Sequence, residues 1–575
     1  MLKLNLTRSA SGAVLSACLL AMSLPGQALS QAIERNTPPS KRPAAPTVPG
    51  PETGSPPNAV IETGPALRGL TISTSAEPPQ RSGETSVLVG EGVRVSPDEL
   101  SAVLARHAGR PMSPTRIAAI QSDIAAIYQD KGYPFVAVST PPQNVTEGRL
   151  HLRVLEFRVG RLEARPLDTY DEISAGLRLG PGDPVYLPRL QEDILWLNRT
   201  PFRNTEASFR PGVQTGQTDL LLETRRSRPV QGYVGAGNTG SESTGWNRVF
   251  AGIQAGGPLL GNGMAAYQFT ISPEDIGNRA DRGYLSHALQ GLLPVTARSE
   301  ADLTVNWVQT HQEVDVFNIE ETVAEAGIGY RIALSDLMDA PFPPSDVRLG
   351  IEARRQVSVV DFDDIRVNST AYNVYQAVVG YSMTNYGRRG ANQFEAAFRI
   401  SPGGIGDANS DERMRLVTQG RMASARYAYL NAALRSSRNL TGGAALSGLV
   451  RVQVTGDALP RTEQMGLGGQ GGSRAFSYDD GASDRAAVVQ AEYQFQPFGM
   501  SARGPELRTS AFFDAAWGDG APGEDDLALA SVGVAASADL LERVTVEATL
   551  GAALTDGPRT QAGDIRLVAR VLARF

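Results

Sequence analysis

Hydrophobic and polar residues alternate along most of the range 229–575. In stretches such as 347–354, 394–400, 448–455 and 544–550, every second residue is apolar or small, and charged residues fall on the other face. A repeat of two residues is typical of β-strands with one apolar face. We count about sixteen such strands and no long helix, which predicts one large antiparallel sheet or barrel.

The last strand, 564–575, indicates where this sheet lies. Arg566, Arg570 and Arg574 share one face, and the chain ends on Phe575; the other face is apolar throughout, with Ile565, Leu567, Ala569, Val571, Ala573 and Phe575. An apolar outer face, a basic inner face and a terminal aromatic are typical of an outer-membrane β-barrel. We therefore expect the three arginines to face the lumen and Phe575 to be a signal for the barrel-assembly machinery. A strand of a soluble sandwich would show the same alternation.

The N-terminus favours the membrane interpretation. Residues 1–30 match a secretory signal peptide, with Lys3 and Arg8 before an apolar stretch at 13–24 and small residues at the cleavage site. Cys18 is the only cysteine, so the mature chain has neither disulfides nor thiolate metal sites. No apolar run reaches the ~18 residues that a membrane-spanning helix needs. An exported chain of this kind would cross a membrane as strands.

Residues 31–84 differ in composition from the rest of the chain. This range is rich in Pro, Ser, Thr and Gly and holds too few apolar residues to form a core. We interpret it as a disordered or polyproline linker. A role as a plug of the lumen, or in recognition, is the alternative.

Two small α+β modules are predicted between the linker and the barrel, at 85–157 and 158–228. The capping box at 96–99 opens the first helix, and an apolar stripe of isoleucines marks the second. Each module has the order βααββ. The first has strands at 87–90, 134–140 and 149–156 around helices at 97–107 and 114–130; the second has strands near 158–163, 202–210 and 218–224 around helices near 170–177 and 188–198. Exposed edges of such sheets can accept an extended peptide as an added strand.

Several motifs in these modules resemble one protein family. They are Tyr-Gln-Asp-Lys-Gly-Tyr at 128–133, a Pro-Gln…Gly signature at 142–150, and the segments 190–198 and 210–219. Residues 85–575 are similar to the two-partner secretion transporters, the haemolysin- and haemagglutinin-exporting branch of the outer-membrane translocases that join POTRA domains to a barrel. The resemblance implies that both modules are POTRA domains.

The resemblance extends to a loop of the barrel. Residues 467–476 occupy the position of the family's long loop, whose tip reads Val-Arg-Gly-Tyr or Val-Arg-Gly-Phe. Here the tip is Ser473, Arg474, Ala475 and Phe476. Alanine replaces the glycine, so the tight turn expected of the tip is in question.

A second barrel motif supplies a partner for the tip. Residues 512–516 resemble the family's Phe-x-Asp-x-Gly strand, with Phe512 and Asp514 retained and Ala516 in place of glycine. Alternation puts Asp514 on the lumen face, and a guanidinium can donate two hydrogen bonds to one carboxylate. With the resemblance, this predicts that Arg474 and Asp514 pair and lock the loop. Without it, Arg474 is a solvated loop cation and Asp514 one more lumen charge.

Other chemistry is not expected. The Gly-x-Gly-x-x-Gly match at 466–471 opens no helix, and the four histidines show no metal-ligand spacing. A net charge of −7 gives no reason to expect nucleic-acid binding. We therefore expect no catalytic residues, no metal and no cofactor.

These observations predict an outer-membrane transporter that is not an enzyme. It would capture an unfolded secreted protein through periplasmic POTRA domains and pass it through the barrel, as a monomer embedded in outer-membrane lipid. An assembly factor that inserts other barrels is the alternative. A self-exporting autotransporter would need a larger passenger than 31–84 provides.

Overall fold

A computed structural model describes most of the chain beyond the N-terminal region. The described residues are 64–79, 86–275, 283–314, 316–338, 343–362, 365–387, 389–499, 505–520, 526–540 and 543–575. The predicted signal peptide at 1–30 and the predicted linker up to residue 63 lie outside them. Two compact units form: residues 64–198 with 204–225, and residues 199–203 with 226–575.

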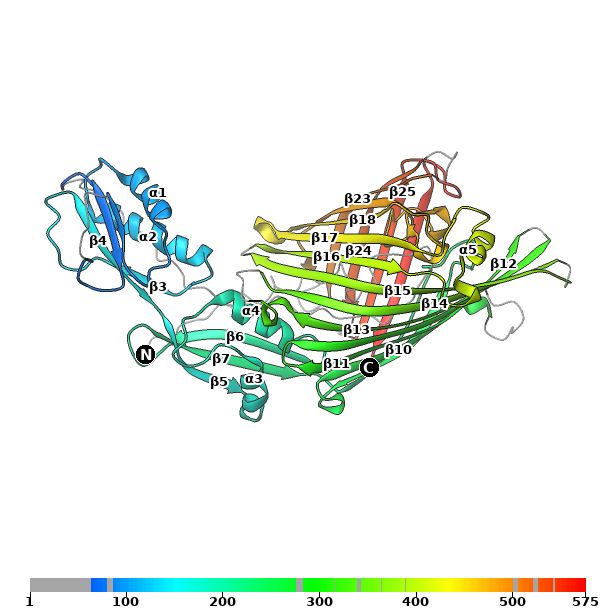
Figure 1. The fold of residues 1–575 in the computed structure, drawn as a ribbon, viewed down its shortest axis with the longest axis horizontal. Coiled ribbons are helices and arrows are strands. Elements are labelled where there is room, and N and C mark those ends of the chain that lie inside the picture. Colours follow the sequence, from blue (N-terminus) through cyan, green and yellow to red (C-terminus); the bar gives the residue numbers. More distant parts are fainter. Residues whose placement is uncertain are drawn as a thin grey trace. The chain divides into compact units, whose positions relative to one another are not determined.

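The first module packs two helices on a four-stranded sheet of order β2-β1-β4-β3 (Figure 1). Its elements are β1 (Gly69–Ser73), β2 (Val87–Val89), α1 (Pro97–His107), α2 (Pro114–Asp130), β3 (Val136–Ser139) and β4 (Arg149–Glu156). The predicted capping box starts α1: the Glu99 N–H donates to Ser96 Oγ at 3.2 Å, and the Ser96 N–H donates to Glu99 Oε2 at 2.8 Å. These bonds satisfy two backbone N–H groups that the first turn leaves unpaired.

Strand β1 corrects the prediction that all of 31–84 is linker. Residues 69–73 pair in parallel with both β2 and β4, so β1 is a central strand of the sheet. Leu70 is 1% exposed and Ile72 is fully buried, so both contribute to the core of the module although the surrounding composition is that of a linker. The first module therefore begins before residue 85.

The second module has the predicted βααββ order. Its elements are β5 (Arg158–Arg165), α3 (Tyr170–Gly176), α4 (Leu187–Leu197), β6 (Arg203–Pro211) and β7 (Gln217–Arg226). The sheet order is β5-β7-β6, so β7 is central and β5 and β6 are the edges. Among the described residues, no helix of the protein is both long and apolar enough to span a membrane.

The rest of the described chain forms a closed barrel of sixteen antiparallel strands, which confirms the predicted fold class. The strands are β8 (Val230–Gly237), β9 (Arg248–Gly257), β10 (Gly263–Ile271), β11 (Tyr284–Thr296), β12 (Ser299–Val314), β13 (Phe317–Ala333), β14 (Ser345–Phe362), β15 (Ile365–Gly387), β16 (Gly390–Ser401), β17 (Tyr427–Asn439), β18 (Ala445–Thr455), β21 (Ala486–Gln494), β23 (Glu506–Gly518), β24 (Leu527–Leu540), β25 (Val544–Ala553) and β26 (Ile565–Arg574). A two-residue segment, β22 (Phe498–Gly499), extends the β21–β23 hairpin. The last strand pairs with the first, so the sheet closes without a free edge.

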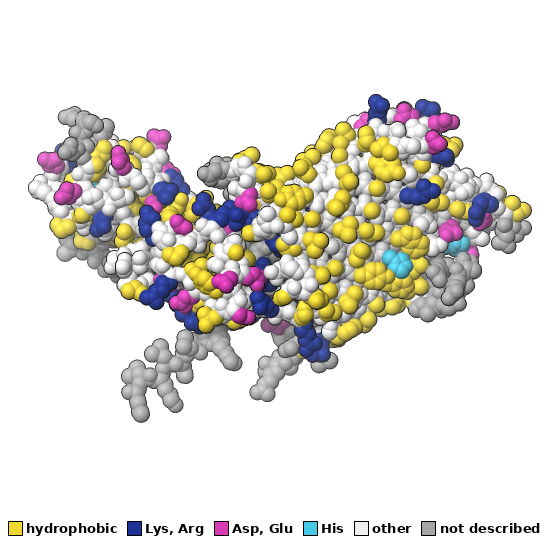
Figure 2. All heavy atoms as spheres, turned by 60° about the horizontal axis from the view of Figure 1, so that its bottom comes forward, with side chains coloured by type: hydrophobic (Ala, Val, Ile, Leu, Met, Phe, Trp, Pro, Cys, Tyr) yellow, Lys and Arg dark blue, Asp and Glu magenta, His cyan; other side chains and the backbone are white. Residues whose placement is uncertain are grey.

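The barrel wall separates apolar from polar side chains as the alternation predicted. On β14, Leu349 and Ile351 are 57% and 64% exposed on the outside, whereas Arg348 lies on the other face and pairs with Asp302 of β12 at 2.7 Å. Figure 2 shows hydrophobic side chains spread over the barrel's outer surface. Such an apolar outside and polar inside suit a wall between lipid and a hydrated lumen.

Candidate functional site: a loop inserted in the barrel

A long loop between β18 and β21, residues 456–485, folds into the barrel; we call it the inserted loop. Its short strands β19 (Met465–Gly466) and β20 (Ala482–Ser483) form a hairpin. Apolar loop residues, among them fully buried Leu467 and Phe476, pack with inward residues of the wall such as Leu529. The loop therefore lies against the inner wall of the barrel.

The tip of this loop is held by a buried ion pair. Arg474 donates from Nε to Asp514 Oδ2 and from Nη2 to Asp514 Oδ1, both at 2.8 Å. The Arg474 backbone N–H also donates to Asp514 Oδ2, at 3.0 Å. Asp514 of β23 is fully buried and Arg474 is 8% exposed. The structure thus brings together the two side chains that the sequence singled out, in the two-bond geometry that suits a guanidinium and a carboxylate.

Two further wall residues contact Arg474. Its Nη1 donates to Glu492 Oε2 of β21 at 2.8 Å, and its guanidinium carbon lies 3.7 Å from the ring centre of Phe512. Glu492 was not predicted from the sequence. Its one available signal was the strand register, which puts Glu492 opposite Phe512 on the same face of neighbouring strands.

The turn at the tip forms without a glycine. The Phe476 N–H donates to the Ser473 carbonyl at 3.1 Å, and Ala475 does not adopt a left-handed conformation. Space for the Ala475 methyl comes from the wall: a Cβ built on Gly551 of β25 would lie 3.2 Å from Ala475 Cβ. Ser473 adds a hydrogen bond from its hydroxyl to that of Ser531 on β24, at 2.8 Å. The glycine that permits this close approach is therefore on the strand.

The three arginines of β26 have different neighbours. Arg566 donates to the carbonyl oxygen of Phe476 in the loop tip and, at 2.9 Å, to that of Gly240. Arg570 lies over the ring of Phe250 on β9, 4.9 Å from its centre. Arg574 donates to Thr545 Oγ1 of β25 at 3.0 Å. Arg566 thus contacts the tip, and the contacts of Arg570 and Arg574 are with the wall.

The remaining predicted residues belong to the wall. Ala516 is 4% exposed and packs in the apolar cluster under the inserted loop. Phe575 extends the pairing of β26 and β8, because it exchanges backbone hydrogen bonds of 3.0 and 3.1 Å with Gly232. Its ring covers Gly232, where an added Cβ would lie 2.4 Å from a ring carbon. Phe575 itself is 65% exposed on the outer face.

Two aspartates after the tip were also missed. Asp479 accepts from the Ser243 N–H at 3.0 Å and its hydroxyl at 2.8 Å, in the loop between β8 and β9. Asp480 accepts from the N–H groups of Arg559 and Thr560, between β25 and β26, at 3.0 and 2.9 Å. The inserted loop is therefore fastened on both sides of the junction where β26 meets β8. The sequence shows a capping box at 477–480 but carries no sign of these distant partners.

The family-like motif of the first module supports its sheet. The Gln143 side chain donates to the His151 carbonyl and accepts from the His151 N–H, both at 2.7 Å. Gly148 has φ of +76°, and an added Cβ there would lie 2.3 Å from the Ala66 carbonyl oxygen. Only glycine tolerates both conditions. The Gln and Gly of the signature are thus explained by hydrogen bonds to β4 and by a close approach to the segment just before β1.

The motif of the second module is also structural. Asp193 is fully buried on α4 and accepts from Arg178 Nε at 2.8 Å and from the Arg178 N–H at 2.9 Å. Glu192 pairs with the same guanidinium. Such a buried charged group needs partners of this kind to offset its desolvation.

Comparisons with known proteins agree with this architecture. A family model described as haemolysin secretion/activation protein ShlB/FhaC/HecB matches residues 216–538, and a ShlB-type POTRA domain model matches residues 85–156. The outer membrane transporter CdiB of Escherichia coli is 21% identical over 443 residues, which cover 75% of this chain and 72% of CdiB. The heme/hemopexin transporter protein HuxB of Haemophilus influenzae is 22% identical over 178 residues, 30% of this chain and 31% of HuxB.

Solved structures share the fold. CdiB from Escherichia coli has a TM-score of 0.65 at 17% identity and covers 91% of this chain and 93% of its own. CdiB from Acinetobacter baumannii has a TM-score of 0.56 at 16% identity and covers 93% of this chain and 94% of its own. With these matches, the barrel lies in the bacterial outer membrane and the POTRA domains lie in the periplasm. Because the first family model covers more than half of its length, the chain belongs to the haemolysin secretion/activation protein family ShlB/FhaC/HecB.

Proposed function

We propose that the chain is a two-partner secretion transporter: its POTRA domains capture an unfolded exported protein, which then passes through the barrel to the cell surface. The observation that carries this proposal is the barrel interior. Many of its inward side chains are polar or charged, including Gln376, Arg399 and Asn431, which are at most 3% exposed. The inserted loop is held in this interior by hydrogen bonds and ion pairs together with the apolar cluster around Leu467 and Phe476.

The sheet edges support capture by strand addition. In the described part of the second module, β6 pairs with β7 alone, so its other edge carries backbone groups without a strand partner. The start of β5 is partly covered, because Val159 exchanges backbone hydrogen bonds with 182–183 at 2.8 and 2.9 Å. An extended peptide would find its donors and acceptors along β6. The Asn198 side chain, at the end of the family-like segment 190–198, covers this edge at one residue: it donates to the Thr205 carbonyl at 2.8 Å and accepts from the Thr205 N–H at 2.7 Å. The rest of the edge has no strand partner among the described residues.

The polar fastening of the loop supports its movement. Water in the lumen can replace each hydrogen bond that the tip loses, so releasing these bonds costs little. The main cost of release is then the apolar packing of Phe476 and Ala475. Folding of the partner outside the cell would make its return unfavourable and so give the transport a direction.

A deletion tests the proposal. Removal of residues 64–157 takes out the whole first POTRA domain, including β1, and leaves every barrel strand. We expect heat-modifiable barrel in the outer membrane at near-normal amounts, with surface export of the partner lost. The candidate partners to test are exported proteins of the same genome, and those whose genes neighbour the gene of this protein should be tested first.

Two results would contradict the proposal. One is normal export by the shortened chain. The other is that loss of the full-length chain lowers the amounts of other outer-membrane barrels while no exported protein depends on it, which would favour the assembly-factor alternative.

A further inference from the structure

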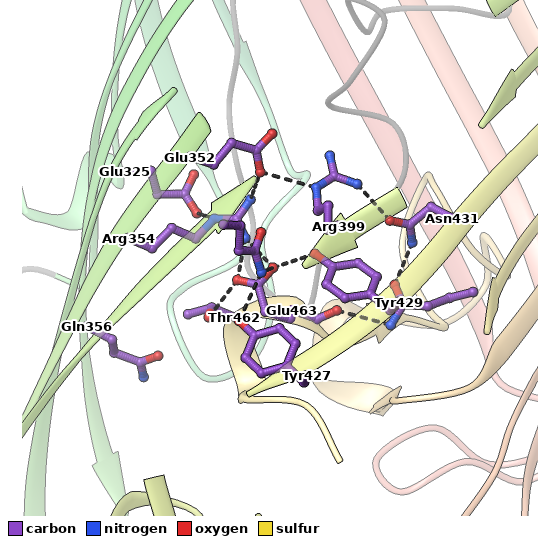
Figure 3. Close-up of polar contacts among 12 residues, drawn as sticks. Glu325, Glu352, Arg354, Gln356, Arg399, Tyr427, Tyr429, Asn431, Thr462 and Glu463 are labelled. Atoms are coloured by element: carbon purple, nitrogen blue, oxygen red, sulfur yellow. Dashed lines mark hydrogen bonds and ion pairs between the residues drawn. The ribbon is translucent and has the colours of Figure 1, made fainter. Parts of the chain in front are cut away.

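A second set of contacts holds the base of the inserted loop, eleven residues before Arg474 in the sequence. Its centre is Glu463, a fully buried residue in the turn Arg461–Glu463. Its carboxylate accepts from Tyr429 at 2.5 Å, from Gln376 at 2.9 Å and from Thr462 at 3.1 Å, and it pairs with Arg354. Figure 3 shows the side chains of Arg354 and Tyr429 reaching Glu463 from two strands of the wall.

The wall around Glu463 is itself an ion-pair network. Arg354 of β14 pairs with Glu325 of β13 at 3.0 Å and with Glu352 at 3.2 Å. Arg399 of β16 pairs with Glu352 at 3.1 Å. Arg354 therefore keeps two carboxylates when Glu463 is removed. Glu463 links the loop to a wall that is already well connected.

The backbone beside Glu463 is held as well. Gln453 of β18 donates from Nε2 to the carbonyl oxygens of Glu463 and Asp484, both at 3.0 Å. One side chain thus ties together the two stems of the inserted loop. Asn431 of β17 orients it, because its Nδ2 donates to Gln453 Oε1 at 2.6 Å.

The two sets of contacts use largely different parts of the barrel, with Arg451 of β18, which donates to the Gly471 carbonyl, as an exception. The base contacts come from β14, β15, β17 and β18, whereas the tip contacts come from β21, β23, β24 and β26. Between Glu463 and Arg474 the chain reads Gln-Met-Gly-Leu-Gly-Gly-Gln-Gly-Gly-Ser, with five glycines. The second half of this segment is bonded to the tip, since the Ser473 N–H donates to the Leu467 carbonyl at 2.8 Å and the Gly469 N–H donates to the Phe476 carbonyl at 3.0 Å. Residues 467–476 therefore form one hydrogen-bonded unit.

We propose that Glu463 is a positioning residue that keeps the base of the inserted loop fixed while the tip leaves Asp514. This inference rests on the proposed transport function, and it specifies how the loop opens: residues 467–476 leave the wall as one unit, and the base at Glu463 stays on the wall. A loop held only at its tip would leave the lumen as one piece.

Spin labels at single cysteines test this in the full-length protein. The mature chain is expected to have no cysteine, and Arg461 and Gln470 are exposed loop residues near the base and near the tip. In Arg474→Ala we expect the label at 470 to become mobile and the label at 461 to keep its immobile spectrum. In Glu463→Ala the label at 461 should become mobile. Glu412→Gln, a change at an exposed helical residue outside the network, should alter neither spectrum.

The outcomes separate this inference from the transport function. Equal mobility at 461 and 470 in Arg474→Ala would overturn the fixed base, and so would an unchanged spectrum at 461 in Glu463→Ala. If Glu463→Ala fails to form a heat-modifiable barrel, Glu463→Gln and the Arg474→Ala spectra still decide. Because the spectra do not depend on a partner, failure of export alone would count against the transport function only.

Discussion

Arg474 contacts carboxylates on two strands, Asp514 on β23 and Glu492 on β21. Burying such a group costs desolvation free energy that offsets much of the ion-pair attraction. The Arg474 ion pair therefore contributes mainly to geometry, since the two hydrogen bonds of the guanidinium fix the position of the loop tip. When the tip leaves, the lumen can solvate Asp514 again. Loss of the pair should then affect transport more than barrel stability.

A double-mutant cycle tests this at the residue scale. We expect Arg474→Ala and Asp514→Ala each to lower export about tenfold, equivalent to about 1.4 kcal/mol, at near-normal barrel abundance. The double variant should be no worse than either single variant, because both remove the same contact. The control is Arg508→Ala, on the same strand as Asp514, which breaks an exposed pair with Asp539 of β24. Additive defects would show that the contact does not contribute to transport.

Reversal of the pair should give only weak rescue. Arg474→Asp with Asp514→Arg restores opposite charges but places the new carboxylate beside Glu492. Like charges at that distance repel each other. Rescue of export should improve when Glu492→Gln is added, and the measurement is surface export by the double reversal with and without Glu492→Gln.

At the scale of elements, β1 shows where composition misleads. Leu70 and Ile72 alternate within five residues, yet they lie beside a Pro-rich stretch, and we interpreted the whole range as linker. The longer elements carried clearer signals: the capping box of α1 and the repeat of two residues in the barrel strands. Local patterns therefore predicted the longer elements, and a short strand stabilised by distant partners was not predicted.

The central position of β1 has a measurable consequence. Ile72→Ala should destabilise the first POTRA domain by about 2–5 kcal/mol, because it leaves a cavity in a packed core. Limited proteolysis of the full-length protein should then cut residues 64–157 faster while the barrel stays resistant. Thr74→Ala, at an exposed position just after β1, should leave the rate unchanged. Equal rates for both variants would mean that β1 does not stabilise the domain.

Local patterns likewise predicted only part of the site. Arg474 and Asp514 could be singled out because the chain resembles a family at both motifs. Glu463, Glu492, Asp479 and Asp480 carry no local signal, since each finds its partners on strands or loops far away in sequence. Their roles depend on how the loop folds against the wall, which alternation along single strands does not specify.

At the scale of the whole molecule, the barrel is a closed wall with a loop fastened to several of its parts. Contacts of Glu463, Ser473 and Arg474 join the loop to strands from β14 to β24. Contacts of Asp479, Asp480 and Arg566 add the junction of β26 and β8. A movement of the loop would therefore change contacts with most strands of the wall. We propose that a partner chain passes through the lumen in which this loop lies.

Cross-linking to a stalled partner tests that claim most directly. The partner would be fused to a tightly folded domain so that export stops midway, and it would carry cysteines along its length. On β25, Thr549→Cys faces the lumen beside Gly551, and the neighbouring Ala548→Cys faces lipid and is its matched control. We predict disulfide cross-links to the partner at 549 and none at 548. Export that continues with no cross-link at 549, or with equal cross-links at both positions, would contradict passage through the barrel.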